Sequence, residues 1–83
     1  MKSNINYKKS IIKDLKKIDR KIRIKLVKLA EQELSADPFK GKRLTGSLKG
    51  LYSLRLGDYR IIYTVIHKDV LILRISHRKN VYE

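Results

Sequence analysis

The 83-residue chain has no cysteine and no tryptophan, a single proline and only two histidines, His67 and His77. Without cysteine there can be no disulfide framework, no thiolate nucleophile and no metal site built on thiolates. Two histidines alone do not make a structural zinc site. We therefore expect neither a metal nor a cofactor.

Long apolar runs are missing as well. No stretch approaches the roughly 18 apolar residues that a membrane span requires. The opening MKSNINYKKS lacks the contiguous apolar region of a signal peptide. We expect a cytoplasmic protein without a membrane partner. Its 83 residues, 42% of them hydrophobic, suffice for one domain over residues 1–83 with one modest core.

Acidic residues are scarce. Eight Asp and Glu stand against 21 Lys and Arg, which gives a net charge of +13. So large an excess repels itself in the folded state and is typical of a protein whose working partner is a polyanion, nucleic acid above all. A lysine-rich composition bias, a membrane surface and an acidic protein partner stay open as causes of the same excess charge.

The first half of the chain is typical of a short strand followed by two helices. Ile5 to Tyr7 fits the strand, and apolar residues then recur at helical spacing from Ser10, which could cap a first helix. Asp19 could cap a second helix that runs to about Leu34, antiparallel to the first after a tight break. The apolar positions are Ile11, Leu15 and Ile18 in the first helix and Ile22, Leu26, Leu29 and Ala30 in the second.

Pro38 ends this helical region, because a proline biases the residue before it away from the α conformation. The stretch from Phe39 to Gly50 then carries three of the four glycines together with Lys40, Lys42, Arg43 and Lys49. It is either a basic connector that contacts nucleic acid or an ordinary solvated loop.

From Leu51 the hydrophobic period changes to two, which indicates strands. In the segment RLGDYR, a two-residue turn at Gly57-Asp58 pairs Leu56 with Tyr59 and sets Arg55 directly opposite Arg60. That register sends one set of side chains to the core: Tyr52, Leu54, Leu56, Tyr59, Ile61, Tyr63 and Val65. The other side of the sheet, turned away from the helices, we call the arginine face. It would carry Ser53, Arg55, Arg60, Ile62, Thr64 and Ile66.

A third strand, Val70 to Ser76, follows the residues His67 to Asp69. A three-residue loop there would pair Ile66 with Val70, send Leu71, Leu73 and Ile75 to the core, and add Arg74 and Ser76 to the arginine face. A two-residue loop at Lys68-Asp69 would instead bury Arg74. Burying an unpaired arginine is expensive, so we expect the three-residue loop, with Arg78 also on the arginine face.

Arginines gathered on one face repel one another unless an anion lies between them, and guanidinium groups fit phosphate oxygens well. Ser53 and Thr64 would add hydroxyl donors, and the C-terminal SHRKNVYE adds His77, Arg78, Lys79 and Tyr82. These residues indicate phosphate binding. They do not by themselves assign an acid and a base for cleavage, and on spacing alone His77 is more typical of a structural or rim residue than of a catalyst.

The run LTGSLKGLYSLRLGDYRIIYTV, continued by VLILRISHRKNVYE after a basic helical hairpin, resembles the RelE family of toxins in the RelE/ParE superfamily, over essentially the whole chain. The resemblance implies an α+β fold in which an N-terminal strand and a helical hairpin pack on one face of a small antiparallel sheet, in the order β-α-α-β-β-β. It also implies the toxin of a type II toxin–antitoxin system, a metal-independent endoribonuclease that cleaves mRNA in the ribosomal A site. Its partners would be mRNA, the ribosome and a RelB-like antitoxin in a hetero-oligomer.

The resemblance also implies roles for individual residues. Arg55 falls at a basic position of the catalytic face, and Arg60 matches the arginine that contacts the scissile phosphate. Arg78 matches an arginine proposed to stabilise the transition state or leaving group. Tyr82 matches a tyrosine thought to stack on the substrate base or orient the nucleophile. Further RNA contacts are expected from Lys42, Arg43, Lys49, Ser53, Arg74 and Lys79.

One position departs from the family pattern. Ser53 stands where some members have a lysine, which leaves the general base open. His77 becomes a candidate, because some relatives use a histidine near the C-terminus. Two alternatives remain: a ParE-like toxin that inhibits DNA gyrase without nuclease activity, and an inactive relative that only binds RNA. In each case Ile62 and Ile66, set among positive charges, would suit an acidic amphipathic segment of the antitoxin.

Overall fold

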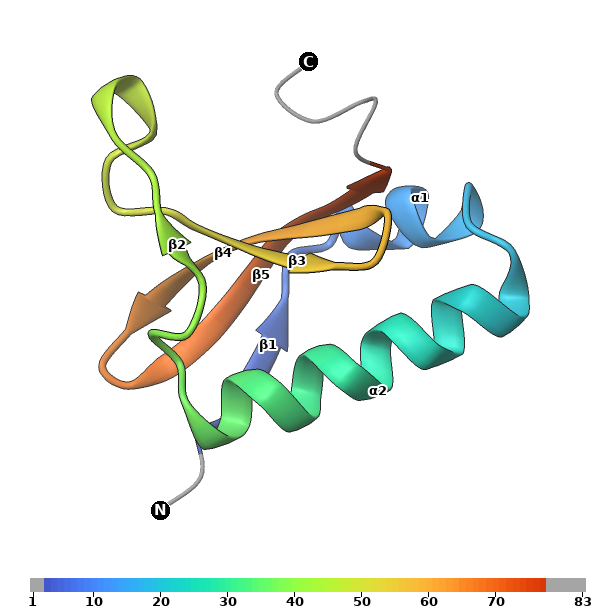
Figure 1. Ribbon diagram of the computed structural model, residues 1–83, viewed down its shortest axis with the longest axis horizontal. Helices are drawn as coiled ribbons and strands as arrows, with labels where there is room; N and C mark the ends of the chain where they lie inside the picture. The colour runs from blue at the N-terminus through green and yellow to red at the C-terminus, as the bar shows by residue number, and fades with distance from the viewer. Residues whose placement is uncertain (1–2, 78–83) are drawn as a thin grey trace.

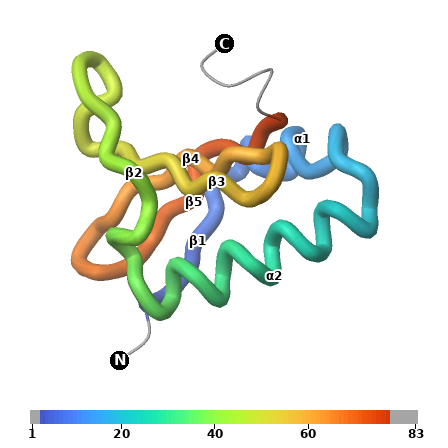
Figure 2. The backbone as a smooth tube through the Cα atoms, viewed as in Figure 1, coloured from blue at the N-terminus to red at the C-terminus, as the bar shows by residue number. Residues whose placement is uncertain are grey.

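The computed structural model describes residues 3–77, which form a five-stranded sheet with two helices on one side (Figures 1 and 2). The elements in chain order are β1 (Ile5–Tyr7), α1 (Ile11–Lys16), α2 (Arg20–Ala36), β2 (Lys42–Arg43), the 3₁₀ helix η1 (Gly46–Leu48), β3 (Tyr52–Leu56), β4 (Tyr59–Ile66) and β5 (Asp69–His77). The strands lie in the order β1-β5-β4-β3-β2. Within residues 3–77 we find no helix long and apolar enough to cross a lipid bilayer.

The expected α+β fold is confirmed, with two corrections to the sheet. β1 pairs in parallel with β5, so the sheet is mixed rather than wholly antiparallel. The connector after Pro38 also contributes a strand that its sequence did not predict, because Lys42 and Arg43 pair with Ser53 and Tyr52. The resulting order β-α-α-β-β-β-β has one more strand than expected.

The helices begin and end close to the expected residues. Asp19 caps α2, since its carboxylate accepts a hydrogen bond of 3.2 Å from the Lys21 N–H. Ser10 does not cap α1; it has helical dihedral angles and no side-chain hydrogen bond to the helix. The chain reverses direction between the two helices (Figure 1), as the sequence predicted.

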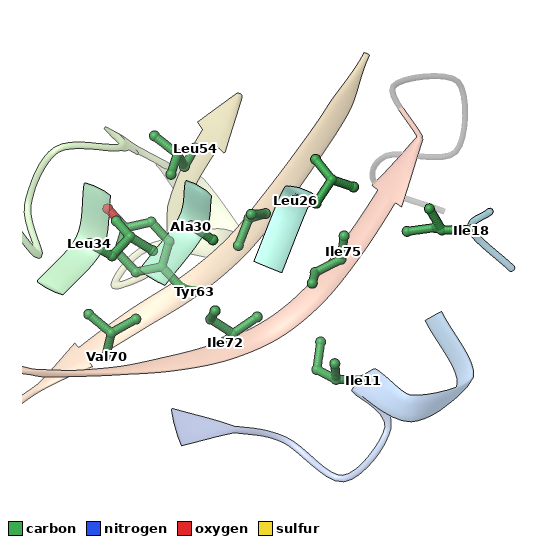
Figure 3. Close-up of a cluster of buried hydrophobic side chains, with 11 residues drawn as sticks. Ile11, Ile18, Leu26, Ala30, Leu34, Leu54, Tyr63, Val70, Ile72 and Ile75 are labelled. Carbon is green, nitrogen blue, oxygen red and sulfur yellow. The ribbon is translucent and has the colours of Figure 1, made fainter. Parts of the chain in front are cut away.

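The core lies between the helices and one face of the sheet (Figure 3). α2 contributes a stripe with helical spacing, and β4 and β5 contribute the most deeply buried strand residues. Ile22, expected in the stripe, is 42% exposed and lines a hollow between the start of α2 and the turn at Gly57. The buried apolar residues are Ile11, Ile18, Leu26, Ala30, Leu34, Leu54, Ile61, Tyr63, Val70, Ile72 and Ile75.

The first hairpin has the predicted register. Leu56 pairs with Tyr59, and Arg55 pairs with Arg60. Gly57 has a φ of +61°, which a residue without a side chain adopts at little cost and which the tight turn requires.

The second hairpin differs from the prediction. Its loop has two residues, His67 and Lys68, with φ angles of +51° and +75°, and Ile66 pairs with Asp69. Two successive positive φ angles are typical of the type I′ turn, which matches the twist of the strands. Consequently Val70 and Ile72 enter the core, in place of Leu71 and Leu73.

A β-bulge then restores the predicted side for the rest of β5. Tyr63 pairs with Ile72 and Ile62 pairs with Arg74, so Leu73 is an extra residue that shifts the register by one. After the bulge Ile75 is buried and Arg74 lies on the arginine face. The expectation that Arg74 avoids the core is therefore correct, but the bulge achieves it and not a three-residue loop.

Candidate nucleic-acid interface

The arginine face carries two rows of side chains that cross the strands. In the first row Lys42 pairs with Ser53, Ser53 with Ile62, and Ile62 with Arg74. In the second row Arg55 pairs with Arg60, and Arg60 pairs with Ser76. The register thus places four cations from four strands on one side of the sheet, namely Lys42, Arg55, Arg60 and Arg74.

Arg55 and Arg60 form the centre of this surface. They lie directly opposite each other in β3 and β4, where Cβ atoms are about 5 Å apart. Arg55 is exposed and its Nε–H donates a long hydrogen bond of 3.5 Å to the carbonyl of Gly57, whereas Arg60 is half-buried. Two guanidinium groups held side by side on a rigid hairpin can grip one phosphate from two directions.

Arg74 lies at the outer margin of the arginine face, on β5. Its Nε is 3.9 Å from Oδ2 of Asp14 in α1. The same carboxylate oxygen accepts a hydrogen bond of 3.1 Å from the Ile75 N–H. The Arg74 side chain keeps 44% of its surface exposed, so this ion pair leaves much of it accessible to a ligand.

An apolar hollow of about 360 Å³ adjoins the basic rows. Ile62 and Leu73 form its floor, and the segment between β2 and β3 forms its wall, rising from the sheet on the side away from α2 (Figure 1). Thr64 fastens this wall, because its hydroxyl donates a hydrogen bond of 2.9 Å to the carbonyl of Gly50. The full lining is Lys8, Leu44, Leu48, Leu51, Ile62, Leu73 and Arg74.

The remaining predicted RNA contacts occupy different places. Arg43 pairs with Tyr52 and therefore points to the helix side of the sheet, although it is exposed at the edge. Lys49 is exposed just after η1, in the wall of the hollow. Ser53 lies on the arginine face but is only 8% exposed, which restricts its contact with any ligand.

His77 is not brought together with the arginine pair. It pairs with Tyr59, which faces the helices, and the two rings meet edge to face at 5.3 Å and 84°. A small cavity of about 100 Å³ adjoins them, and its lining includes Asp14 and Lys17 of α1. The structure therefore places His77 on the opposite side of the sheet from Arg60. Arg78, Lys79 and Tyr82 lie outside the described residues.

Two parts of this surface were not predicted from the sequence. Asp14 has the pattern of an ordinary polar residue of α1, and its contact with β5 joins residues 61 positions apart in the chain. Leu44 and Leu48 of the hollow lie in the expected connector and Leu51 follows directly after it, and the three recur at spacings of four and three. That spacing is the signal by which an apolar wall could have been recognised.

A small α+β fold with a basic, helix-free sheet face, together with the matches that follow, identifies a toxin of the RelE/ParE superfamily. Residues 5–82 match the family described as ParE toxin of the type II toxin-antitoxin system, parDE, and the chain belongs to this family.

Its relatives include Toxin RelG of Mycobacterium tuberculosis, with 34% identity over 99% of this chain and 98% of the relative. The Putative toxin RelE1 of Methanocaldococcus jannaschii is 32% identical over 100% of this chain and 98% of the relative. Among solved structures, the toxin–antitoxin complex RelBE2 from Mycobacterium tuberculosis contains a chain with a TM-score of 0.87 and 33% identity. That match covers 94% of this chain and 100% of the other.

Proposed function

We propose that this toxin is a ribosome-dependent, metal-independent endoribonuclease that cleaves mRNA in the ribosomal A site and so inhibits translation. The observation that carries the proposal is the direct cross-strand pairing of Arg55 with Arg60 on an otherwise open sheet face. Like charges opposed across two strands destabilise a sheet. The arrangement is useful when a phosphodiester binds between them.

The proposed chemistry is attack of the neighbouring 2′-hydroxyl on the scissile phosphorus, which breaks the bond from phosphorus to the 5′-oxygen of the next nucleotide and yields a 2′,3′-cyclic phosphate. The attacking hydroxyl loses its proton, and the departing 5′-oxygen takes one up to become a 5′-hydroxyl. Negative charge builds up on the phosphoryl oxygens in the transition state, and preorganised cations stabilise that charge more than they stabilise the substrate. We assign this role to Arg55 and Arg60. The resemblance to RelE toxins adds Arg78 and Tyr82 as further catalytic residues, directly after β5 in the sequence. The position of His77 gives it no direct access to a phosphate held by Arg60, so proton transfer is not assigned to it.

A second set of cations supports the ribosome as the place of action. Ten lysines and arginines lie between Lys8 and Lys28, against two aspartates, and most of them are exposed. They lie in and around α1 and α2, and Lys8 also lines the hollow beside Arg74. Folded ribosomal RNA offers a polyanionic surface for this helix layer while the arginine face engages the mRNA.

The proposed protein partner is a RelB-like antitoxin that neutralises the toxin in a hetero-oligomer. Chains similar to this one were solved in the RelBE2 toxin–antitoxin complex from Mycobacterium tuberculosis and in the RelB-RelE antitoxin–toxin complex from Methanococcus jannaschii. The apolar hollow rimmed by Lys8 and Arg74, and the 50% exposed Ile66, suit an acidic segment with apolar anchors. Co-purification with the product of a neighbouring short acidic open reading frame tests this partner, and failure of that product to restore growth would contradict it.

The decisive experiment compares the parent chain with Arg60→Ala and a control, Lys68→Gln, after induced expression. Lys68 is an exposed cation in the turn between β4 and β5, at the other end of the strand from Arg60. Loss of a positioned charge should slow cleavage about 10²- to 10³-fold, so Arg60→Ala should relieve growth arrest while Lys68→Gln does not. Primer extension on cellular mRNA should show discrete cuts, phased with codons, for the parent and Lys68→Gln only.

The alternative function is inhibition of DNA gyrase without nuclease activity, which the match to the ParE family favours. A gyrase inhibitor would leave mRNA intact and block supercoiling by purified gyrase. Growth arrest without mRNA cuts, together with inhibited supercoiling, would select that function. Arrest by Arg60→Ala as complete as that by the parent would show that the assigned site is wrong.

A further inference from the structure

β5 has an open edge beside the arginine face. β1 pairs only with Val70 to Ile72 of β5, and the Lys8 N–H then donates to the carbonyl of Ile72 at 2.9 Å. Beyond Ile72, no strand among residues 3–77 pairs with β5 on that side. The Ile75 N–H points to this edge and is satisfied by Oδ2 of Asp14 at 3.1 Å. A side chain of α1 thus takes the place of a neighbouring strand.

The same carboxylate also lies close to Arg74 of the arginine face. Asp14 Oδ2 is 3.9 Å from Arg74 Nε, and the Asp14 side chain is only 14% exposed. One oxygen atom therefore contacts both the backbone of β5 and a guanidinium group of the candidate site. The carboxylate belongs to a helix that packs against β5, since Ile11 of α1 is buried in the core beside Ile75.

These contacts come directly after the bulge at Leu73. A bulge can move along a strand, and a shift of one residue turns every later side chain to the opposite face. Such a shift would turn Arg74 toward the helices and expose Ile75. The Ile75 N–H points to α1 only in the observed register. Its hydrogen bond to Asp14 therefore favours this register over one shifted by a residue.

We propose that Asp14 is a positioning residue for the arginine face. Its carboxylate fixes the register of β5 after the bulge through Ile75 and draws the Arg74 guanidinium to the margin of the face. Arg74 is thereby held beside the row formed by Arg60 and Ser76. The proposal rests on the proposed RNA cleavage: we expect Arg74 to contact a phosphate of the bound RNA, and Asp14 acts through Arg74.

The test is a double-substitution cycle with Asp14→Asn, Arg74→Gln and the two combined, assayed by the kinetics of cleavage of ribosome-bound mRNA. Asparagine keeps an oxygen for Ile75 and removes the charge that orients Arg74. We expect Asp14→Asn to lower kcat about fivefold with KM within about twofold, and to have no further effect in the Arg74→Gln background. General destabilisation would lower the apparent kcat in both backgrounds, so the absence of a further effect in the Arg74→Gln background separates positioning from destabilisation.

Asp19→Asn is the matched control, since Asp19 is a carboxylate of the same helix layer that caps α2 and contacts Lys21 instead. It should leave kcat unchanged. Equal kcat values for Asp14→Asn and the parent, or independent and additive effects of Asp14→Asn and Arg74→Gln, would overturn the proposal.

A second measurement does not depend on catalysis. Amide hydrogen exchange at Ile75 should accelerate about tenfold in Asp14→Ala and stay near the parent value in Asp14→Asn. If the parent fails to cleave mRNA, the proposed function is wrong, and this measurement still decides the positioning role. Unchanged exchange at Ile75 in Asp14→Ala would refute it. Should Asp14→Ala not fold, Arg74 side-chain resonances in Asp14→Asn serve instead: increased mobility at Nε supports the proposal and unchanged mobility overturns it.

Discussion

Replacing Arg55 with glutamine should make the folded chain more stable and weaken its binding to RNA. Arg55 lies directly opposite Arg60, and its hydrogen bond to Gly57 is 3.5 Å long and exposed, so it contributes little. Like charges at about 5 Å between Cβ atoms, in the high dielectric of a surface, repel by about 0.3–1 kcal/mol. We expect a gain of about 0.5 kcal/mol in the free energy of unfolding at low salt.

Urea denaturation followed by circular dichroism measures the gain. The gain in the free energy of unfolding should disappear at high salt, since the Debye length falls from about 30 Å at 0.01 M to about 3 Å at 1 M ionic strength. Binding of a short single-stranded RNA, followed by fluorescence anisotropy, measures the loss. The slope of log K against log salt concentration should become shallower by about 0.7, the value for one phosphate contact on a single strand.

Lys68→Gln provides the control, because it removes the same charge from an exposed position at the far end of β4. Its stability and its salt slope should both stay close to those of the parent. Two results would refute this reasoning. A lower stability of Arg55→Gln at low salt would show that Arg55 and Arg60 do not repel each other in the folded chain. An RNA salt slope equal to that of the parent would show that Arg55 does not contact a phosphate.

Three further predictions concern the scaffold. Gly41→Ala would place a Cβ atom 2.6 Å from the hydroxyl oxygen of the fully buried Tyr63, so the free energy of unfolding in urea should fall by about 1–3 kcal/mol. Combining Gly41→Ala with Tyr63→Phe should recover part of that loss. If the losses of the two single variants simply add in the double variant, the Cβ atom introduced at position 41 does not clash with the Tyr63 hydroxyl. Leu34→Ala should lower the free energy of unfolding by about 2–5 kcal/mol in the same assay, and a loss below about 1 kcal/mol would mean that the Leu34 site collapses around the alanine. Partial burial and a hydrogen bond to Glu31 raise the pKa of Tyr7 above its usual value of 10.0. The protonated Tyr7 side chain therefore contributes fully to stability below about pH 10, and this contribution is lost as the pH rises from there toward the pKa of the folded state. The urea midpoint should therefore drop less for Tyr7→Phe than for the parent between about pH 8 and about pH 11, and equal drops would contradict this.

Local signals explain why the first hairpin could be predicted from the sequence. Gly57 supplies the positive φ of the turn, and strict alternation on both sides allows only one register that keeps Arg55 and Arg60 out of the core. The second helix could be predicted for a similar reason, since Asp19 caps it and its apolar stripe has helical spacing.

The features that were not predicted depend on contacts distant in the sequence. Histidine and lysine give no local sign of the positive φ angles at His67 and Lys68, so the predicted loop length was wrong. The bulge at Leu73 depends on packing of both halves of β5 against the helices, which alternation alone does not reveal. β2 has only two residues and exists because β3 offers it an edge. The side on which His77 lies could have been predicted, because the expected register put Ser76 and Arg78 on the arginine face and so turned His77 toward the helices.

The interior position of β5 affects when, during synthesis, the sheet and its arginine face can assemble. β5 lies between β1 and β4, and its residues Val70, Ile72 and Ile75 complete the core. A nascent chain therefore has no finished sheet, and no assembled Arg60–Ser76 row, until residue 77 has emerged from the exit tunnel. The basic face proposed to bind RNA is thus incomplete for as long as the C-terminal strand is still being translated.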